Sequence, residues 1–405
     1  MNILFLTVGR FDSIEAHSIY ADLLRCFRNR GHEVYVISPY EKRTGRKTEL
    51  VEEKGAHVLH IETGDVTGSG NIIKKGLAQL SIESIYIKAI KKYFSEVKFD
   101  LVMYSTPPIT FCNAVEFVKK RDKAMTYLLL KDIFPQNAVD LGMMTTKGLK
   151  GLIYRHFRNK ERKLYAISDH IGCMSQANVK YVLDHNPEVD PSKVEICPNA
   201  VELVDRSVTN ARGMEIREKY DVPKDRKVFI YGGNLGKPQG IPFLIDCLRT
   251  VKDLEKAYFL IIGSGTDYGK LESFINEEKP ENVRLMKLLP KEDYDSMVGA
   301  CDVGLIFLDH RFTIPNFPSR LLAYMQAKIP VYAVTDPNTD IGKIIEEGGL
   351  GWWSESNDTA SFRKTILDIT GCDKLPEMGV KGYEYMAEHY DVRLLYETIT
   401  SHHKG

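Results

Sequence analysis

The stretch VFIYGGNLGKPQGIPFLIDCLRT, residues 228–250, decides the fold class of this chain. Its first four residues predict a buried strand, four glycines then predict a tight turn, and apolar residues at helical spacing follow from residue 241. Strand, glycine turn and helix amino terminus together form a seat for an anion, because the first helical N–H groups lack a partner within the helix. Lys237 adds a positive charge to this turn. An ordinary strand-to-helix turn is the alternative interpretation.

Apolar strands and amphipathic helices alternate on both sides of this stretch, which predicts an α/β protein of two successive doubly wound, Rossmann-like domains. We expect the first domain at 1–200, the second at 201–382, and a segment at 383–405 whose helix packs back toward the first domain. The two sheets are expected to face each other across a cleft. The expected strands are 2–8, 34–38, 101–104, 125–130, 171–174, 194–197, 228–231, 258–262, 283–285, 303–308 and 330–334.

Two polar, charged segments of the first half, 41–56 and 63–76, predict mobile loops. The residues after them, 77–94, predict a helix whose apolar residues are Leu80, Ile85, Ile87, Ile90 and Phe94.

The composition excludes several classes of protein. The chain has 55 basic residues (lysine and arginine) and 55 acidic residues (aspartate and glutamate), and this balance argues against a dedicated nucleic-acid-binding protein. The seven cysteines form no Cys-x-x-Cys pair and indicate reduced core residues of a cytoplasmic protein. No apolar run reaches the ~18 residues of a membrane span, and no signal peptide is evident after Met1.

Two strands of the first half end in polar residues, at the sheet edge where this architecture places function. Gly9 and Arg10 follow the first strand, and Lys131 and Asp132 follow the strand at 125–130. A helix cap or turn residue is the alternative interpretation of Asp132. The first turn lacks the G-x-G-x-x-G pattern, which disfavours a nicotinamide dehydrogenase.

No metal site is expected. The Asp-Tyr-Asp at 293–295 follows a proline, so acidic residues in the first turn of a helix explain it better than a metal. His57 with His60, and His402 with His403, lack acidic or thiol partners in the sequence.

The segment 147–163 holds seven lysines or arginines against one acid, Glu161, interleaved with apolar residues. A helix of this kind can lie on an anionic membrane surface. A core-packed helix with a solvated basic face is the equally open alternative.

The chain resembles, over nearly its whole length, the GT-B glycosyltransferases of family four, which are retaining enzymes that use nucleotide sugars. It looks most like bacterial O-antigen and capsule enzymes, especially N-acetyl-L-fucosamine transferases. The segments that carry the resemblance are RGHEVYVISP (30–39), TPP (106–108), KDIFPQNAVDLGMM (131–144), ICPNAVE (196–202), YGGNLGKPQG (231–240), IIGSG (261–265) and NFPSRLLAYMQAKIPV (316–331).

The resemblance implies that the second domain binds the donor and the first faces the reacting sugar. Catalytic roles fall on Asp132, Lys131, Lys237 and Arg320. Substrate binding falls on Gly9, Arg10, Gly233, Asn234, Gly236, Gly263, Gly265, Leu288, Leu289, Asn316 and Ser319. The leaving diphosphate would accept the acceptor's proton, and no metal or cofactor would take part.

Three positions depart from the family pattern. Many relatives carry two glutamates where this chain has Pro315 and Ala323, and many have Arg or His in place of Lys131. The Arg and Lys of a common phosphate-binding pair fall on Asn234 and Gln239.

The leading hypothesis is transfer of an N-acetylated amino sugar from a UDP-sugar to a polyprenyl-diphosphate-linked saccharide at the inner face of the cytoplasmic membrane. A UDP-sugar 2-epimerase of the same architecture is the first alternative. A catalytically silent protein that binds nucleotide sugar is the second.

Overall fold

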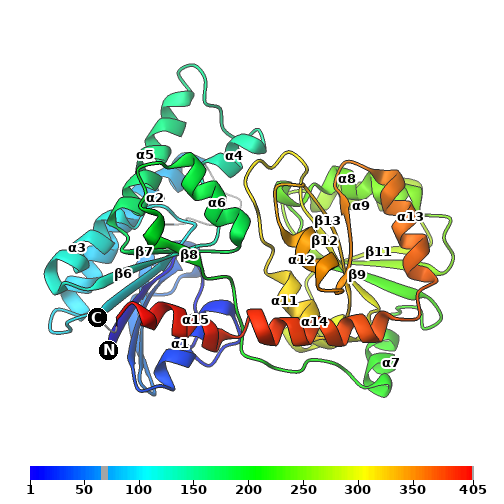
Figure 1. Ribbon diagram of the computed structural model, residues 1–405, viewed down its shortest axis with the longest axis horizontal. Coiled ribbons are helices and arrows are strands. Elements are labelled where there is room, and N and C mark those ends of the chain that lie inside the picture. Colours follow the sequence, from blue (N-terminus) through cyan, green and yellow to red (C-terminus); the bar gives the residue numbers. More distant parts are fainter. Residues whose placement is uncertain (65–71, 404–405) are drawn as a thin grey trace. The chain divides into compact units, whose positions relative to one another are not determined.

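The computed structural model describes residues 1–64 and 72–403, and the side chains of 1–64 and 81–403 (Figure 1). The chain divides into two compact units: unit 1 is Met1–Glu202 with Val392–Gly405, and unit 2 is Leu203–Asp391. Each unit is a largely or wholly parallel sheet with helices on both faces, so the predicted pair of Rossmann-like α/β domains is confirmed. Among the described helices, none has the length and apolar character that crossing a bilayer requires.

The sheet of unit 1 has the strand order β3-β4-β2-β1-β5-β6-β7-β8, and every pair is parallel except β3–β4. Near-continuous apolar runs form its central strands, because both faces of a parallel sheet are covered. The strands are β1 (Asn2–Leu6), β2 (Glu33–Glu41), β3 (Glu49–Glu53), β4 (Ala56–Thr63), β5 (Leu101–Ser105), β6 (Met125–Leu130), β7 (His170–Cys173) and β8 (Val194–Ile196).

Two helix layers cover this sheet. One layer is α1 (Ile19–Arg28) and α15 (Val392–Ser401), which lie side by side although almost the whole chain separates them (Figure 1, blue and red). The other face carries α2 (Ile72–Tyr93), α3 (Cys112–Asp122), α5 (Gly151–Ile167) and α6 (Gln176–His185). The short helix α4 (Gln136–Asp140) follows β6.

Unit 2 is a six-stranded parallel sheet with the order β11-β10-β9-β12-β13-β14. The strands are β9 (Lys227–Asn234), β10 (Ala257–Ser264), β11 (Val283–Met286), β12 (Val303–Phe307), β13 (Val331–Thr335) and β14 (Gly351–Glu355). One face packs against α8 (Ile241–Thr250), α9 (Tyr268–Glu278) and α13 (Thr359–Thr370). The remaining helices are α7 (Asn210–Lys219), α10 (Lys291–Ala300), α11 (Arg320–Gln326), α12 (Ile341–Glu347) and α14 (Leu375–His389).

Three predictions of secondary structure were wrong. The expected loop at 41–56 contains the end of β2, the whole of β3 and the start of β4, because an edge strand with one charged face resembles a loop in sequence. Of the expected loop at 63–76, residues 65–71 lie outside the described residues, and 72–76 belong to α2. The side chain of Leu80 also lies outside the described residues.

The third wrong prediction is the single last helix near 383–399, which is in fact two helices, α14 and α15. The helical path breaks between them, where the Val392 N–H donates to the Val201 carbonyl oxygen at 3.1 Å. This bond joins the segment to unit 1, and only α15 belongs to that unit.

Candidate active site

The glycine turn joins β9 to α8, and α8 begins at the predicted residue, Ile241. Gly233 has φ of +124° and Gly240 has φ of +58°, values that favour glycine. A Cβ on Gly240 would lie 3.3 Å from the Cα of Asp309, the residue just beyond β12. The Asp309 N–H also donates to the Pro238 carbonyl oxygen at 3.0 Å. The backbone of the turn is therefore held from both sides.

Gly263 and Gly265, at the end of β10, permit the close approach of this same turn. A Cβ on Gly263 would overlap the carbonyl oxygen of Gly233, and one on Gly265 would overlap that of Leu235. The Leu235 N–H donates to the Ser264 carbonyl oxygen at 2.9 Å. Packing of backbone on backbone accounts for both glycines, and their contact with a ligand stays a prediction.

A pair of amides, Asn234 and Gln239, closes the turn. Asn234 Nδ2 donates to Gln239 Oε1 at 3.0 Å, and the Gly236 N–H donates to the same oxygen at 3.2 Å. Gly236 is buried, whereas Asn234 and Lys237 are exposed. Lys237 has no ion pair with another described residue, so its charge is available to a ligand.

Arg320, the first residue of α11, lies beside the glycine turn. Its guanidinium is 4.3 Å from the centre of the Tyr231 ring, and its Nη2 would be 3.4 Å from a Cβ on Gly233. Within the described part of the chain, two buried donors of this segment have no acceptor: Arg320 Nη1 and Asn316 Nδ2. Buried polar atoms without partners are costly, and an anionic or hydroxyl-rich ligand would supply the missing acceptors.

The other predicted donor-side residues lie at the same carboxyl edge of the unit 2 sheet. Leu288 follows β11 and is 65% exposed, and Leu289 is half-buried beside it. Ser319 is exposed, and its side chain makes no capping hydrogen bond to α11. These positions leave an apolar surface and a hydroxyl open to solvent, and their contact with a donor stays a prediction.

Tyr294 is a residue near this edge that the sequence did not single out. A Cβ on Gly232 would overlap its hydroxyl, so the glycine makes room for it. Burial raises the pKa of Tyr294 to about 12, which keeps the hydroxyl protonated as a donor. Asp293, one residue earlier, binds Lys219 at 2.7 Å within unit 2. It lies in the first turn of α10, as the sequence predicted.

In unit 1, Lys131 and Asp132 extend from the end of β6 and are held by Thr106, at the end of β5. Thr106 Oγ1 accepts from the Lys131 N–H at 3.0 Å and from the Asp132 N–H at 3.1 Å. It also donates to the Asp132 carbonyl oxygen at 2.9 Å. Thr106 thus explains why the polar segment keeps one geometry at the sheet edge.

The pKa values of both side chains, Asp132 and Lys131, are shifted from their ordinary values. Asp132 Oδ2 accepts from Asn137 Nδ2 at 2.7 Å, while its buried Oδ1 has no partner in the described part. Burial raises the pKa of Asp132 from 3.8 to about 6. Burial also lowers the pKa of Lys131 to about 8, although its Nζ donates to the Cys197 carbonyl oxygen at 3.1 Å.

Such shifts toward neutral pH are typical of functional groups. The alternative interpretation of Asp132 as a helix cap is wrong, because α4 begins only at Gln136.

Gly9 and Arg10 lie at the other part of the same sheet edge, where β1 and β2 end. Gly9 is exposed, and its N–H donates to Thr7 Oγ1 at 3.0 Å. Arg10 borders a pocket of about 540 Å³. The lining is rich in guanidinium groups and consists of Val8, Arg10, Pro39, Tyr40, Glu41, Arg43, Thr44 and Arg46. The sequence did not predict this pocket, since half of its lining comes from the segment 41–46, all of which was predicted to be a mobile loop.

The three arginines of the pocket are placed by local partners. Arg10 Nε lies 2.5 Å from Asp12 Oδ1, and Arg43 Nε lies 2.6 Å from Glu41 Oε2. The Arg46 guanidinium lies over the Tyr40 ring at 5.0 Å. Asp12 and Glu41 balance two of the three guanidinium charges, which leaves a net positive charge of one at the pocket for an anion.

Comparison with known proteins agrees with these features. Residues 18–205 match the model of Glycosyltransferase Family 4, and 214–382 match that of Glycosyl transferases group 1. A probable glycosyltransferase, WbjE of Pseudomonas aeruginosa, is 26% identical over 76% of this chain and 74% of its own. The putative colanic acid biosynthesis glycosyl transferase WcaI of Escherichia coli is 23% identical over 59% of this chain and 58% of its own.

Solved structures share the fold along the whole chain. A sucrose-phosphate synthase of Thermosynechococcus elongatus has a TM-score of 0.77 at 13% identity, over 100% of this chain and 98% of its own. Anabaena HepE in complex with UDP-glucose has a TM-score of 0.69 at 16% identity, over 99% and 100%. The fold is therefore that of the GT-B glycosyltransferases, and the first half of the chain matches a family 4 model while the second half matches a group 1 model.

Proposed function

We propose that the protein transfers a sugar, with retention of anomeric configuration, from a UDP-sugar to a lipid-linked saccharide of bacterial surface polysaccharide synthesis. The observation that carries the donor side is two buried donors without an acceptor among the described residues: Arg320 Nη1, beside the glycine turn, and Asn316 Nδ2, four residues earlier. HepE, a structural neighbour, was solved with UDP-glucose, which supports a UDP-sugar as the donor. The resemblance of the motifs favours an N-acetylated amino sugar such as N-acetyl-L-fucosamine.

In this proposal, cationic side chains of unit 2 stabilise the departing diphosphate. Lys237 is exposed in the turn, and Arg320 lies against Gly233. Charge that develops on the leaving oxygens is stabilised best by donors fixed beforehand, and losing one typically costs about 3–4 kcal/mol of barrier. The Tyr231 ring holds the Arg320 guanidinium in place before the donor binds.

Asp132 would orient hydroxyl groups on the acceptor side. Once the Asp132 carboxyl is ionised, its Oδ1 can accept a hydrogen bond but cannot donate one. With a pKa of about 6, this carboxyl is mostly ionised at pH 7. The diphosphate itself would take the acceptor's proton, so this reaction needs no protein base and no metal. Transfer rates unchanged by a chelator would agree with this, and their loss would contradict it.

The arginine pocket of unit 1 supports an acceptor with a diphosphate group. Three guanidinium groups line it, two of them paired with Asp12 and Glu41, and planar guanidinium groups bind phosphate oxygens in pairs. A polyprenyl diphosphate would provide such oxygens next to its first sugar. Replacing Arg43 and Arg46 by alanine should raise the KM for a lipid-diphosphate acceptor and leave the KM for the donor unchanged.

A membrane surface is the natural place for such an acceptor, and the start of α5 supports contact with one. Leu149 is 87% exposed, and Leu152 and Ile153 are each 55% exposed. Lys147, Lys150 and Arg155 accompany them, which gives apolar residues for insertion among basic residues for anionic headgroups.

The rest of α5 contributes less to this surface than the sequence suggested. Arg158 binds Glu161 at 2.8 Å, and Arg162 binds Glu188 at 3.0 Å. Their charges are neutralised by neighbours in unit 1, so the proposed membrane surface is the short segment 147–155.

The experiment that tests the proposal combines binding with turnover. Ligand that binds only the native protein raises its thermal midpoint, so UDP and a series of UDP-sugars are screened this way. The donor found is then incubated with and without lipid-diphosphate saccharides. Product that forms only with acceptor and keeps the anomeric configuration agrees with the proposal. Epimerised UDP-sugar without acceptor would favour an epimerase, and binding without turnover would favour a silent partner.

A further inference from the structure

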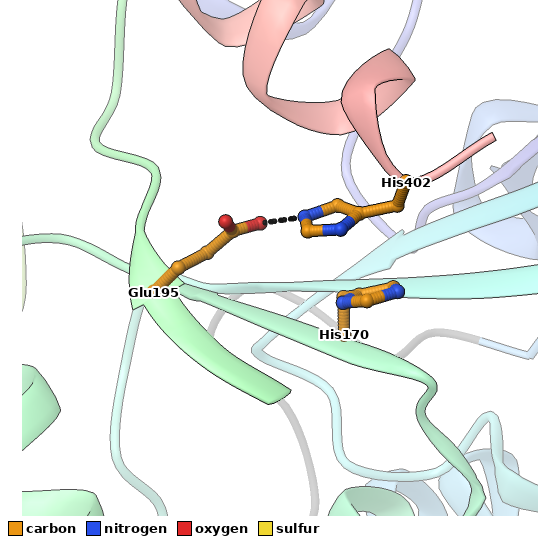
Figure 2. Close-up of side chains that lie close together, drawn as sticks. All are labelled: His170, Glu195 and His402. Atoms are coloured by element: carbon orange, nitrogen blue, oxygen red, sulfur yellow. Dashed lines mark hydrogen bonds and ion pairs between the residues drawn. The ribbon is translucent and has the colours of Figure 1, made fainter. Parts of the chain in front are cut away.

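Three side chains from distant parts of the sequence meet in unit 1, away from the site described above (Figure 2). His170 opens β7, Glu195 lies in β8, and His402 lies in the turn after α15. His402 Nε2 is 2.8 Å from Glu195 Oε1, and the rings of His170 and His402 stack with centroids 3.6 Å apart. The expectation that His402 lacks an acidic partner was wrong, because Glu195 is 207 positions away in sequence.

The cluster contains an unused ligand atom. His170 Nδ1 is buried and has no hydrogen-bond partner in the described part of the chain. Buried polar atoms without partners are costly, and a metal ion would give this nitrogen the partner that it lacks.

We propose that His170, Glu195 and His402 form a binding site for a divalent transition metal of the zinc class. Two imidazole nitrogens and one carboxylate oxygen are a ligand set that zinc uses, with water in the fourth position. One ligand atom from each residue lies within 4.8 Å of the others. Ligand atoms around tetrahedral zinc are ~3.3 Å apart, so small side-chain rotations bring the three atoms onto one ion.

Tyr127 supports the carboxylate from outside the cluster. Its hydroxyl donates to Glu195 Oε1 at 2.7 Å and so fixes the orientation of the group. Partners of this kind orient metal ligands, and removing one typically weakens metal binding about 10- to 100-fold. The ring of Tyr127 also lies within 6.4 Å of that of His402, centroid to centroid, which restricts where the turn after α15 can lie.

The ion would link the turn after α15 to β7 and β8, without taking part in sugar transfer. Tyr127 pairs with His170 across β6 and β7, and Lys131 follows the end of β6, four residues beyond Tyr127. Four residues of strand span about 13 Å, which separates His170 from Lys131 and Asp132.

A second cluster, His17, Asp22 and Glu202, is a poorer candidate. Arg25 already occupies its centre, with a nitrogen 2.6 Å from Asp22 and another 2.8 Å from Glu202. A guanidinium in this position supplies the positive charge that a metal would bring.

The test uses the whole protein after dialysis against a chelator. Zinc is titrated by calorimetry, and cobalt is used as a probe whose visible spectrum reports nitrogen and oxygen ligands. We expect one equivalent of zinc in the wild type and a loss of affinity of at least about 100-fold in His402→Ala and His170→Ala. Tyr127→Phe should lose about 10- to 100-fold, and zinc should raise the thermal midpoint only of proteins that bind it.

His403→Ala is the matched control, because it removes the neighbouring histidine but no member of the cluster, and it should bind zinc like the wild type. Failure of the wild type to bind zinc would overturn the proposal. Wild-type affinity in His402→Ala would overturn it as well, and so would loss of binding in His17→Ala alone. Because the readout is metal binding, none of these results depends on the sugar-transfer activity.

Discussion

Replacement of Asp132 by asparagine distinguishes a strained functional carboxylate from a structural one, because the two roles predict opposite changes in stability. Burial raises the pKa of Asp132 from 3.8 to about 6, so the folded protein holds this proton more tightly than the unfolded chain. The free energy of unfolding therefore falls as the pH rises from about 3.8 to about 6, and it stays constant at higher pH. Relative to low pH, this shift destabilises the folded state by about 2 kcal/mol at pH 5 and about 3 kcal/mol at pH 8.

Asparagine keeps an oxygen for the 2.7 Å hydrogen bond from Asn137 and carries no charge at either pH. We expect Asp132→Asn to be more stable than the wild type, with an advantage that grows by about 1 kcal/mol from pH 5 to pH 8. For a unit of about 200 residues this is roughly 2–4 °C in the thermal midpoint. Scanning calorimetry of both proteins across this pH range measures it.

Asp169→Asn is the matched control of opposite sign. Burial disfavours the charge of Asp169, but hydrogen bonds from Lys119 at 2.6 Å and from Thr126 outweigh burial and hold its pKa below the ordinary value. Asp169→Asn should therefore lower the thermal midpoint at neutral pH. Sugar transfer by Asp132→Asn should show a reduced kcat with a smaller change in donor affinity. A variant that is less stable than the wild type at pH 8, or fully active, would show that Asp132 is a structural residue.

Three further predictions concern other parts of the site. Arg320→Ala should keep the fold but lose the stabilisation by UDP and at least about 100-fold in kcat, measured by thermal shift and initial rates. Gly263→Ala should lower the thermal midpoint by the equivalent of about 1–3 kcal/mol, because its Cβ overlaps the Gly233 carbonyl, whereas Gly269→Ala meets open space and should not. Leu149→Ser should weaken sedimentation with anionic vesicles more than Arg162→Ala does, and equal binding by both variants would contradict the membrane surface.

Local signals were enough to predict the elements of the glycine turn. A buried strand, glycines with positive φ and the start of α8 at Ile241 lie within a few residues of one another, and each signal is read without knowing the rest of the fold. The two predicted pairs at strand ends, Gly9-Arg10 and Lys131-Asp132, were placed correctly at one sheet edge for the same reason.

Long-range contacts decided what the sequence could not predict. Thr106 holds the backbone of Lys131 from 25 positions away, and Glu195 meets His402 from 207 positions away. The hairpin of β3 and β4 forms because β4 joins the sheet beside β2, not because of its own composition. The break before α15 depends on the bond from Val392 to the Val201 carbonyl. None of these partners has a local signature.

Among the predicted site residues, the unpartnered atoms of the two units differ in chemical type, and this difference is a physical argument for two different substrate groups. At the predicted site residues of unit 2 they are donors, Arg320 Nη1 and Asn316 Nδ2, which suit the oxygens of a diphosphate. At those of unit 1 the unpartnered atom is an acceptor, Asp132 Oδ1, and its neighbour Asn137 leaves another acceptor, Oδ1, free of partners within the described residues. Acceptors suit sugar hydroxyls, which donate. A protein that only bound a nucleotide would have no need to keep a carboxylate buried and unsatisfied in the other unit, at a cost of about 3 kcal/mol.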